Sequence, residues 1–129
     1  MNWPFAIAGS IACIVAVVHS VLGERWVFRR MRHDGAIPTN GGNVLREPHV
    51  RILWASWHIV SVLGLALAAC LFYLAAAVAS EPAAKFFGSA VAISMLISSV
   101  LVFVGTSAKH VGWLGLLLVA LFSAWGVLK

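Results

Sequence analysis

A few ionisable and aromatic side chains lie near the ends of long apolar runs in this sequence. His19 and Glu24 close the first apolar run. Trp54 and His58 lie one helical turn apart in the second run, and His110 precedes the last. Imidazole groups bind iron, copper and zinc, and a histidine exchanges protons near neutral pH. These residue types predict a site for haem, a transition metal or a quinone.

The depth of the two membrane histidines favours a common site. His19 lies about 6 Å of helix before Gly23, and His58 lies about 10 Å of helix after Arg51. Both therefore fall at a similar level in one leaflet. An ionisable side chain inside a membrane helix marks a functional site by default, because burying it without a partner costs at least a few kcal/mol.

Three kinds of ligand fit these residues. A haem would take His19 and His58 from facing helices, with Trp54 beside it. A transition metal would be held by a larger set, namely His19, Glu24, His58 and His110. A quinone needs only a hydrogen-bonding histidine, a carboxylate that moves the proton and aromatic walls. No motif of fixed spacing selects among the three, so the ligand and any catalytic residue stay open.

The same side chains also have a structural interpretation. His19 would then be a neutral imidazole bonded to Ser61 or to a backbone carbonyl of a neighbouring helix. Glu24 would pair with Arg25 or Arg51 at the membrane boundary. A cluster that only joins helices would suit a noncatalytic accessory or assembly subunit of a membrane complex.

The elements that position these residues are long apolar segments. The chain has 129 residues, of which 62% are hydrophobic and only 10% are charged, far from the average of soluble domains. About 20 apolar residues of helix cross a bilayer core, and continuous hydrophobicity indicates helices rather than a barrel. Four segments qualify: 4–23, 52–79, 86–105 and 111–128. They predict an all-α integral membrane protein, one transmembrane domain over residues 1–129 folded as a four-helix up-and-down bundle.

Basic residues set the expected orientation. The connection over residues 24–51 is rich in arginine, whereas the second connection holds only Lys85. Lys and Arg in short loops stay in the cytoplasm, so the N-terminus and the C-terminus are expected outside. The formal net charge of +5 at pH 7 is then explained by the basic residues of the cytoplasmic connections. Anionic lipid headgroups are the expected partners, and nucleic acid is not expected because no binding motif accompanies the charge.

The stretch ERWVFRRMRH directly after the first apolar run has two faces. One face carries Arg25, Arg29 and Arg32. The other carries Val27, Phe28 and Met31. This pattern is typical of a helix in the headgroup plane, so we expect contact with the lipid bilayer there. Other membrane subunits or further copies of the chain are the remaining candidate partners.

The two cysteines are expected to be free. Counted from the cytoplasmic ends of their helices, Cys13 lies about 15 Å deep and Cys70 about 27 Å deep. A disulfide needs Cα atoms within about 7 Å. Both are therefore predicted to be buried thiols.

Two short blocks resemble a known group of proteins. HSVLGER, residues 19–25, and WASWHIVSV, residues 54–62, are similar to segments of small uncharacterised bacterial four-helix inner-membrane proteins. The resemblance covers the first two helices and implies a multi-pass protein of the bacterial inner (plasma) membrane, but it implies no activity.

Transport is a weaker alternative. The chain is similar in size to the small multidrug resistance exporters, which work as dimers around a glutamate in the middle of the first helix. Glu24 lies instead at the end of that helix. The strong charge bias also opposes the dual topology that such a dimer would need.

Overall fold

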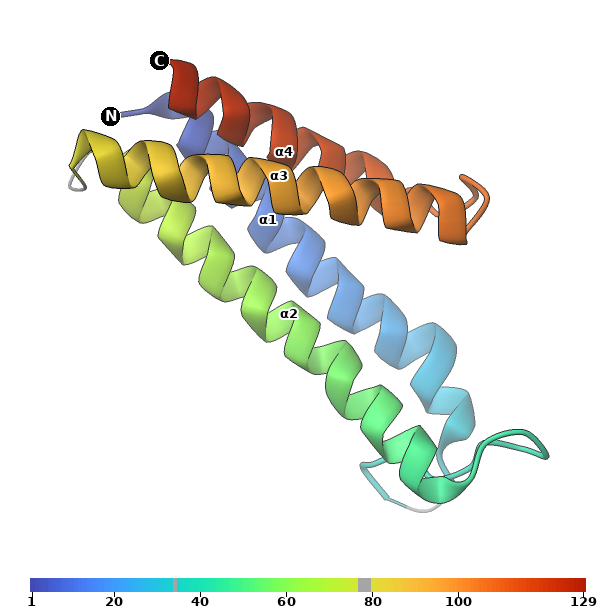
Figure 1. Cartoon of the computed structure of the whole chain (residues 1–129). Helices are drawn as coiled ribbons and strands as arrows, with labels where there is room; N and C mark the ends of the chain where they lie inside the picture. The colour runs from blue at the N-terminus through green and yellow to red at the C-terminus, as the bar shows by residue number, and fades with distance from the viewer. Residues whose placement is uncertain (34, 77–79) are drawn as a thin grey trace. The chain divides into compact units, whose positions relative to one another are not determined.

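The computed structural model describes residues 1–33, 35–76 and 80–129, and every regular element in this part of the chain is a helix (Figure 1). The predicted all-α class is therefore confirmed. The only extended pairing among the described residues is a single antiparallel bridge between Gly41 and Leu45. The helices are, in chain order, α1 (Trp3–Leu22), the π-helix η1 (Gly23–Val27), the 3-10 helix η2 (Phe28–Met31), α2 (Glu47–Ala75), α3 (Glu81–Gly105) and α4 (Gly112–Leu128).

The chain forms two compact units. Unit 1 comprises Met1–Val15 and Gly64–Lys129, and unit 2 comprises Ala16–Leu63. Unit 1 therefore contains the start of α1, the end of α2 and both later helices. Unit 2 contains the end of α1, η1, η2, the long connection and the start of α2.

Two helices begin earlier than their apolar runs predict. α2 begins at Glu47 rather than residue 52, and α3 begins at Glu81 rather than residue 86. In both, a glutamate and then a proline open the first turn, where a carboxylate is favoured and the missing N–H of proline costs nothing. Each glutamate also pairs with a cation one turn later, Glu47 with Arg51 and Glu81 with Lys85. The predicted end of the second segment falls on residues 77–79, outside the described residues.

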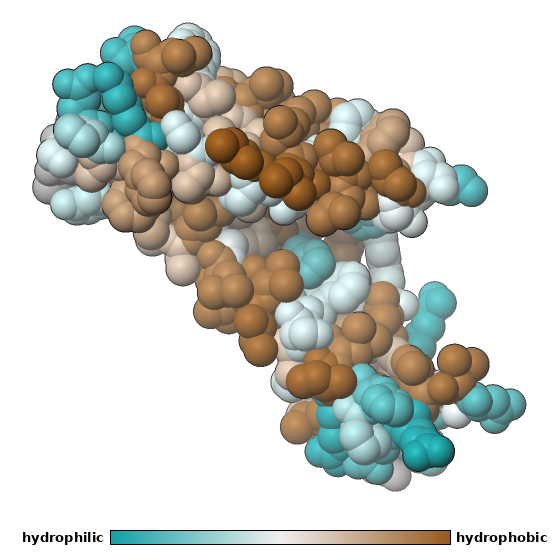
Figure 2. All heavy atoms as spheres, viewed as in Figure 1, coloured by the Kyte–Doolittle hydropathy of each residue, from teal (hydrophilic) through white to brown (hydrophobic). Residues whose placement is uncertain are grey.

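Three helical stretches are long and apolar enough to cross a membrane: Trp3–Met31, Glu47–Ala75 and Glu81–Gly105. Helix α4 is also apolar but has only 17 residues, the lower limit for a span. Large apolar side chains are exposed along the helices, as in Ile14, Val62 and Leu101. Figure 2 shows these hydrophobic surfaces along the helices and hydrophilic residues gathered toward helix ends. This distribution fits helices that are long and apolar enough to cross a membrane.

Unit 1 is held together by close apolar packing. Phe5 is buried against Gly88 and Gly126, where an added Cβ would come within 2.7 Å of the ring. Ala8 and Ala12 are buried in the same core, as expected for a stripe of small residues that lets membrane helices approach closely. Helices α3 and α4 pack side by side in this unit (Figure 1).

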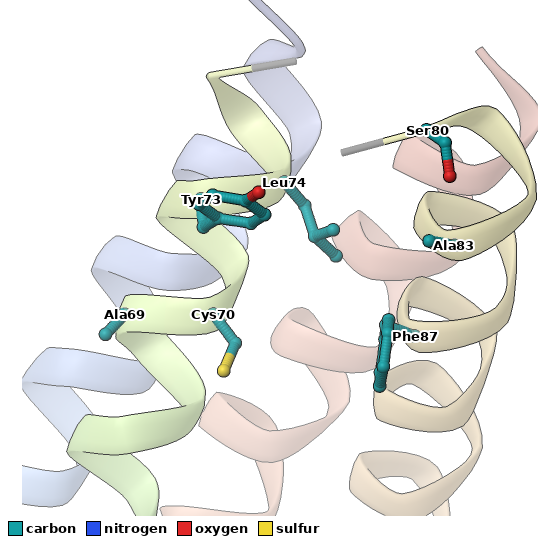
Figure 3. Close-up of a pocket in the computed structure, with 7 residues that line it drawn as sticks. All are labelled: Ala69, Cys70, Tyr73, Leu74, Ser80, Ala83 and Phe87. Atoms are coloured by element: carbon teal, nitrogen blue, oxygen red, sulfur yellow. The ribbon is translucent and has the colours of Figure 1, made fainter. Parts of the chain in front are cut away.

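The two cysteines are both free, as predicted. Cys13 is partly buried, but the prediction that Cys70 is buried is wrong, because its side chain is exposed. It faces an apolar cavity of about 660 Å³ in unit 1, which Tyr73 and Phe87 also line (Figure 3). None of the described residues that line the cavity is a histidine or carries a carboxylate.

Candidate functional site

The polar site of the chain lies in unit 2, where α1 changes into a π-helix. In η1 the backbone N–H of Phe28 donates to the carbonyls of Gly23 and Glu24, and the bond to Gly23 is the i→i+5 bond of a π-helix. Gly23 is buried against the indole of Trp57, which leaves no room for a Cβ. The Trp57 Nε1–H donates to the backbone carbonyl of His19 at 3.0 Å. The lack of a side chain at Gly23 thus lets α2 pack closely against the start of the π-helix.

Glu24 is the anionic centre of this site. One carboxylate oxygen forms an ion pair with the Arg32 guanidinium. The other accepts a hydrogen bond from Trp54 Nε1 at 3.3 Å and lies 3.5 Å from His58 Nε2. The carboxylate is 31% exposed. Groups from α2 and from the connection therefore converge on one carboxylate at an accessible position.

His58 connects Glu24 to a pair of hydroxyl groups. Its Nδ1 lies 2.7 Å from Ser20 Oγ, and Ser20 lies 3.0 Å from Ser61 Oγ. With protons on both ring nitrogens, Nδ1 donates to Ser20, Ser20 donates to Ser61, and Nε2 faces Glu24. With Nδ1 bare, the Ser20 hydroxyl turns and donates to it. The two arrangements differ by one proton, so the cluster can hold or release a proton without moving a heavy atom.

Aromatic rings surround the polar groups. The His19 ring stacks on Trp57, with centroids 4.4 Å apart and planes 7° apart. Trp54 meets His58 edge-on at 5.1 Å. Phe28 is fully buried, 5.6 Å from the Trp57 ring and 6.0 Å from the His58 ring. Trp54 and Phe28 thus pack against the His58 imidazole.

A small open depression gives access to the cluster. Its volume is about 420 Å³ and its lining is Ser20, Val21, Glu24, Arg25 and His58. Binding pockets for small molecules commonly measure about 300–1,000 Å³. The wall thus presents a hydroxyl, a carboxylate, an imidazole and a guanidinium beside one apolar side chain.

The structure brings His58 and Trp54 to Glu24, whereas the described residues show no sign of the larger predicted metal set. The described residues contain no group of three or more His, Cys, Asp or Glu side chains that could hold a metal ion. His110 belongs to unit 1, where its Nδ1 accepts a hydrogen bond from the Gly112 N–H at 3.0 Å. The metal site of His19, Glu24, His58 and His110 therefore finds no support.

The two predicted haem ligands, His19 and His58, meet different partners in unit 2. His19 stacks on Trp57, whereas His58 directs one ring nitrogen to Ser20 and the other toward Glu24. A bis-histidine haem would need a free ring nitrogen on each side. Haem ligation by His19 and His58 therefore finds no support either.

Two structural expectations about this region are wrong. Glu24 pairs with Arg32 rather than Arg25 or Arg51, because the chain turns back after η2 and Arg51 is already paired with Glu47. Phe28 was expected on a lipid-facing surface, but it is buried in unit 2. The change to a π-helix and then a 3-10 helix alters the direction of every side chain after Gly23.

Three residues of the site escaped the sequence analysis: Ser20, Arg32 and Trp57. Ser20 had a usable signal, because it lies four residues before Glu24 and so shares its helical face. Arg32 had none, since its position depends on the turn that follows η2. Comparisons with protein family models, curated proteins and solved structures found no match for this chain. The function is therefore argued from the geometry of the cluster.

Proposed function

We propose that the protein is a multi-pass protein of the bacterial inner membrane that binds a quinone headgroup at Ser20, Glu24 and His58. The arginine-rich connection would lie in the cytoplasm, with both termini outside, because basic loops are retained there. The helices would form an up-and-down bundle. The site then lies near the cytoplasmic boundary, where a quinone headgroup and water can both reach it.

The observation that carries this proposal is the placement of His58 between Ser20 and Glu24 beside the open depression. A quinone carries carbonyl groups that accept hydrogen bonds, and its reduced form carries hydroxyl groups that donate them. The Ser20 hydroxyl and the His58 imidazole can each do either. The cluster therefore supplies a partner for both forms of the ligand.

Proton exchange with the bound headgroup follows from the same geometry. His58 can accept a proton when Ser20 reverses its hydrogen bond, and the Glu24 carboxylate stabilises the charge that results. Arg32 and Trp54 hold Glu24 in place for this role. No metal ligand set is needed, which agrees with the contacts of the described residues.

The test is a titration of the purified protein in detergent with a short-chain quinone, followed by quenching of tryptophan fluorescence. We expect His58→Ala to weaken binding by about five- to thirteenfold, since one lost hydrogen bond of about 1 to 1.5 kcal/mol has that effect. Trp54→Phe should remove part of the quenching without a similar loss of affinity. His110→Ala is the matched control and should bind like the wild type. Equal affinities for the two histidine variants would refute the proposal.

An accessory role in a membrane complex is the second candidate. It is favoured by one observation, namely that Glu24, His58 and Ser20 bond to protein groups within the unit. Such a cluster can serve to fix the helix contact alone. Gentle purification of the tagged protein distinguishes the two functions. The accessory role requires a defined larger complex and no quinone binding, whereas the quinone site predicts binding by the isolated chain.

A further inference from the structure

Three neighbouring arginines of unit 2 have no ion-pair partner among the described residues. Arg25 belongs to η1, and Arg29 and Arg30 belong to η2. All three are exposed. In contrast, Arg32 and Arg51 are each paired with a glutamate.

The carboxylates of the described chain cannot neutralise these arginines. Glu24 is paired with Arg32, Glu47 with Arg51, and Glu81 with Lys85. Three positive charges within six residues are therefore exposed without a counterion among the described residues. Such a concentration of guanidinium groups attracts phosphate, which matches their planar fork of donors.

An exposed aromatic side chain lies between these charges. Trp26 is 62% exposed, and the neighbouring Val27 is 36% exposed. A tryptophan is favoured at the level of lipid headgroups, where its ring is partly in the apolar phase and its N–H remains hydrated. The segment therefore combines cations that can bind a phosphate with an apolar side chain that can contact the glycerol region of a lipid.

We propose that Arg25, Trp26, Arg29 and Arg30 form a binding surface for the phosphate headgroup of an anionic phospholipid. The phosphate lies against the guanidinium groups, and Trp26 inserts beside the glycerol region of the same lipid. Arg25 also lines the depression of the proposed quinone site, but the affinity of the lipid surface comes from the exposed arginines rather than from His58. The proposed site is more specific than a general attraction of basic loops to membranes. It does not include Arg32, because that arginine is paired with Glu24.

The proposal is tested by native mass spectrometry of the full chain from micelles that contain equal amounts of phosphatidylglycerol and phosphatidylcholine. The wild type should retain phosphatidylglycerol preferentially. The triple variant Arg25→Gln, Arg29→Gln, Arg30→Gln should lose about tenfold or more of that preference. The matched control removes three exposed cations elsewhere, Arg46→Gln, Lys109→Gln and Lys129→Gln, and should keep it.

Further outcomes separate the sources of the phosphate. Equal loss in the two triple variants would show that only net charge matters and would overturn the proposal. Displacement of the lipid by millimolar inorganic phosphate would show a site for free anions instead, and would also overturn it. Trp26→Ala should weaken lipid retention while the arginines remain, which an anion site would not predict. Because all of these side chains are exposed, the variants should fold, and unchanged melting temperatures in detergent would verify this.

Discussion

The two units of this chain hold their helices together by different means. In unit 1, Phe5 packs against glycines and small residues, and the hydroxyl of Ser99 satisfies a single carbonyl, that of Trp113. In unit 2, a carboxylate, an imidazole and two hydroxyl groups bond across the helix contact and are enclosed by aromatic rings. Packing of small residues is sufficient to join helices in lipid. The polar contact in unit 2 is therefore more than stability requires, which is why we assign the function to it.

The largest effects should come from the buried phenylalanine of each unit. Phe5 and Phe28 are 1% and 0% exposed, so replacing either with alanine should lower the free energy of unfolding by about 3 kcal/mol. Only Phe28→Ala should also weaken quinone binding, because only Phe28 contacts the rings of His58 and Trp57. Denaturation in detergent and the fluorescence titration measure the two quantities.

The exposed Phe86 provides the control for this comparison, since it is 69% exposed and its replacement should leave stability nearly unchanged. If Phe5→Ala and Phe28→Ala altered ligand affinity equally after correction for the folded fraction, the functional contrast between the units would fail.

A smaller effect is expected from the glycines that allow close contact. Gly23→Ala would displace the Trp57 indole and break its bond to the His19 carbonyl. We expect the free energy of unfolding to fall by about 2 to 3 kcal/mol, because of overpacking and the broken hydrogen bond. Gly126→Ala crowds the Phe5 ring at 2.7 Å without breaking a side-chain hydrogen bond, so about 1 to 2 kcal/mol is expected. A larger loss for Gly126→Ala in thermal unfolding would contradict this order.

The smallest effects on stability are expected from replacing two glutamates that each pair with a cation. Glu24→Gln keeps the shape of the side chain but removes the charge that Arg32 and His58 face. Glu24→Gln should lower the free energy of unfolding by about 1 kcal/mol, since the pair is partly exposed. It should also reduce quinone affinity. Glu81→Gln affects an exposed pair with Lys85 and should change neither quantity measurably. Similar behaviour of the two variants would mean that the Glu24 site is an ordinary surface ion pair.

The position of the site along the helices could be predicted from the sequence, because helical rise per residue is constant. Counting residues placed His19 and His58 at similar positions along their helices, and in the structure His19 stacks on Trp57, the neighbour of His58. The four apolar runs likewise located the helices, although the bounds of these runs do not include the polar first turns that begin at Glu47 and Glu81.

The rotation of side chains around the helix could not be predicted in the same way. A regular α-helix was assumed after Gly23, and it put Arg32 on the face of Arg25 and Arg29. The i→i+5 bond of η1 and the 3-10 turn of η2 change that angle. Nothing in the composition of the segment indicates a π-helix, and Gly23, where it begins, packs against Trp57, a residue distant in sequence.

The π-helix also has a consequence for insertions and deletions in this chain. Removing one residue between Gly23 and Val27 would restore ordinary helical bonding and rotate all that follows by about 100° around the helix axis. Phe28 would leave the Trp57 ring, and Arg32 would no longer return to Glu24. A deletion of this kind should therefore be far more damaging than a conservative substitution at the same place. The number of residues from His19 to Arg32 is as strictly constrained as their chemical identities.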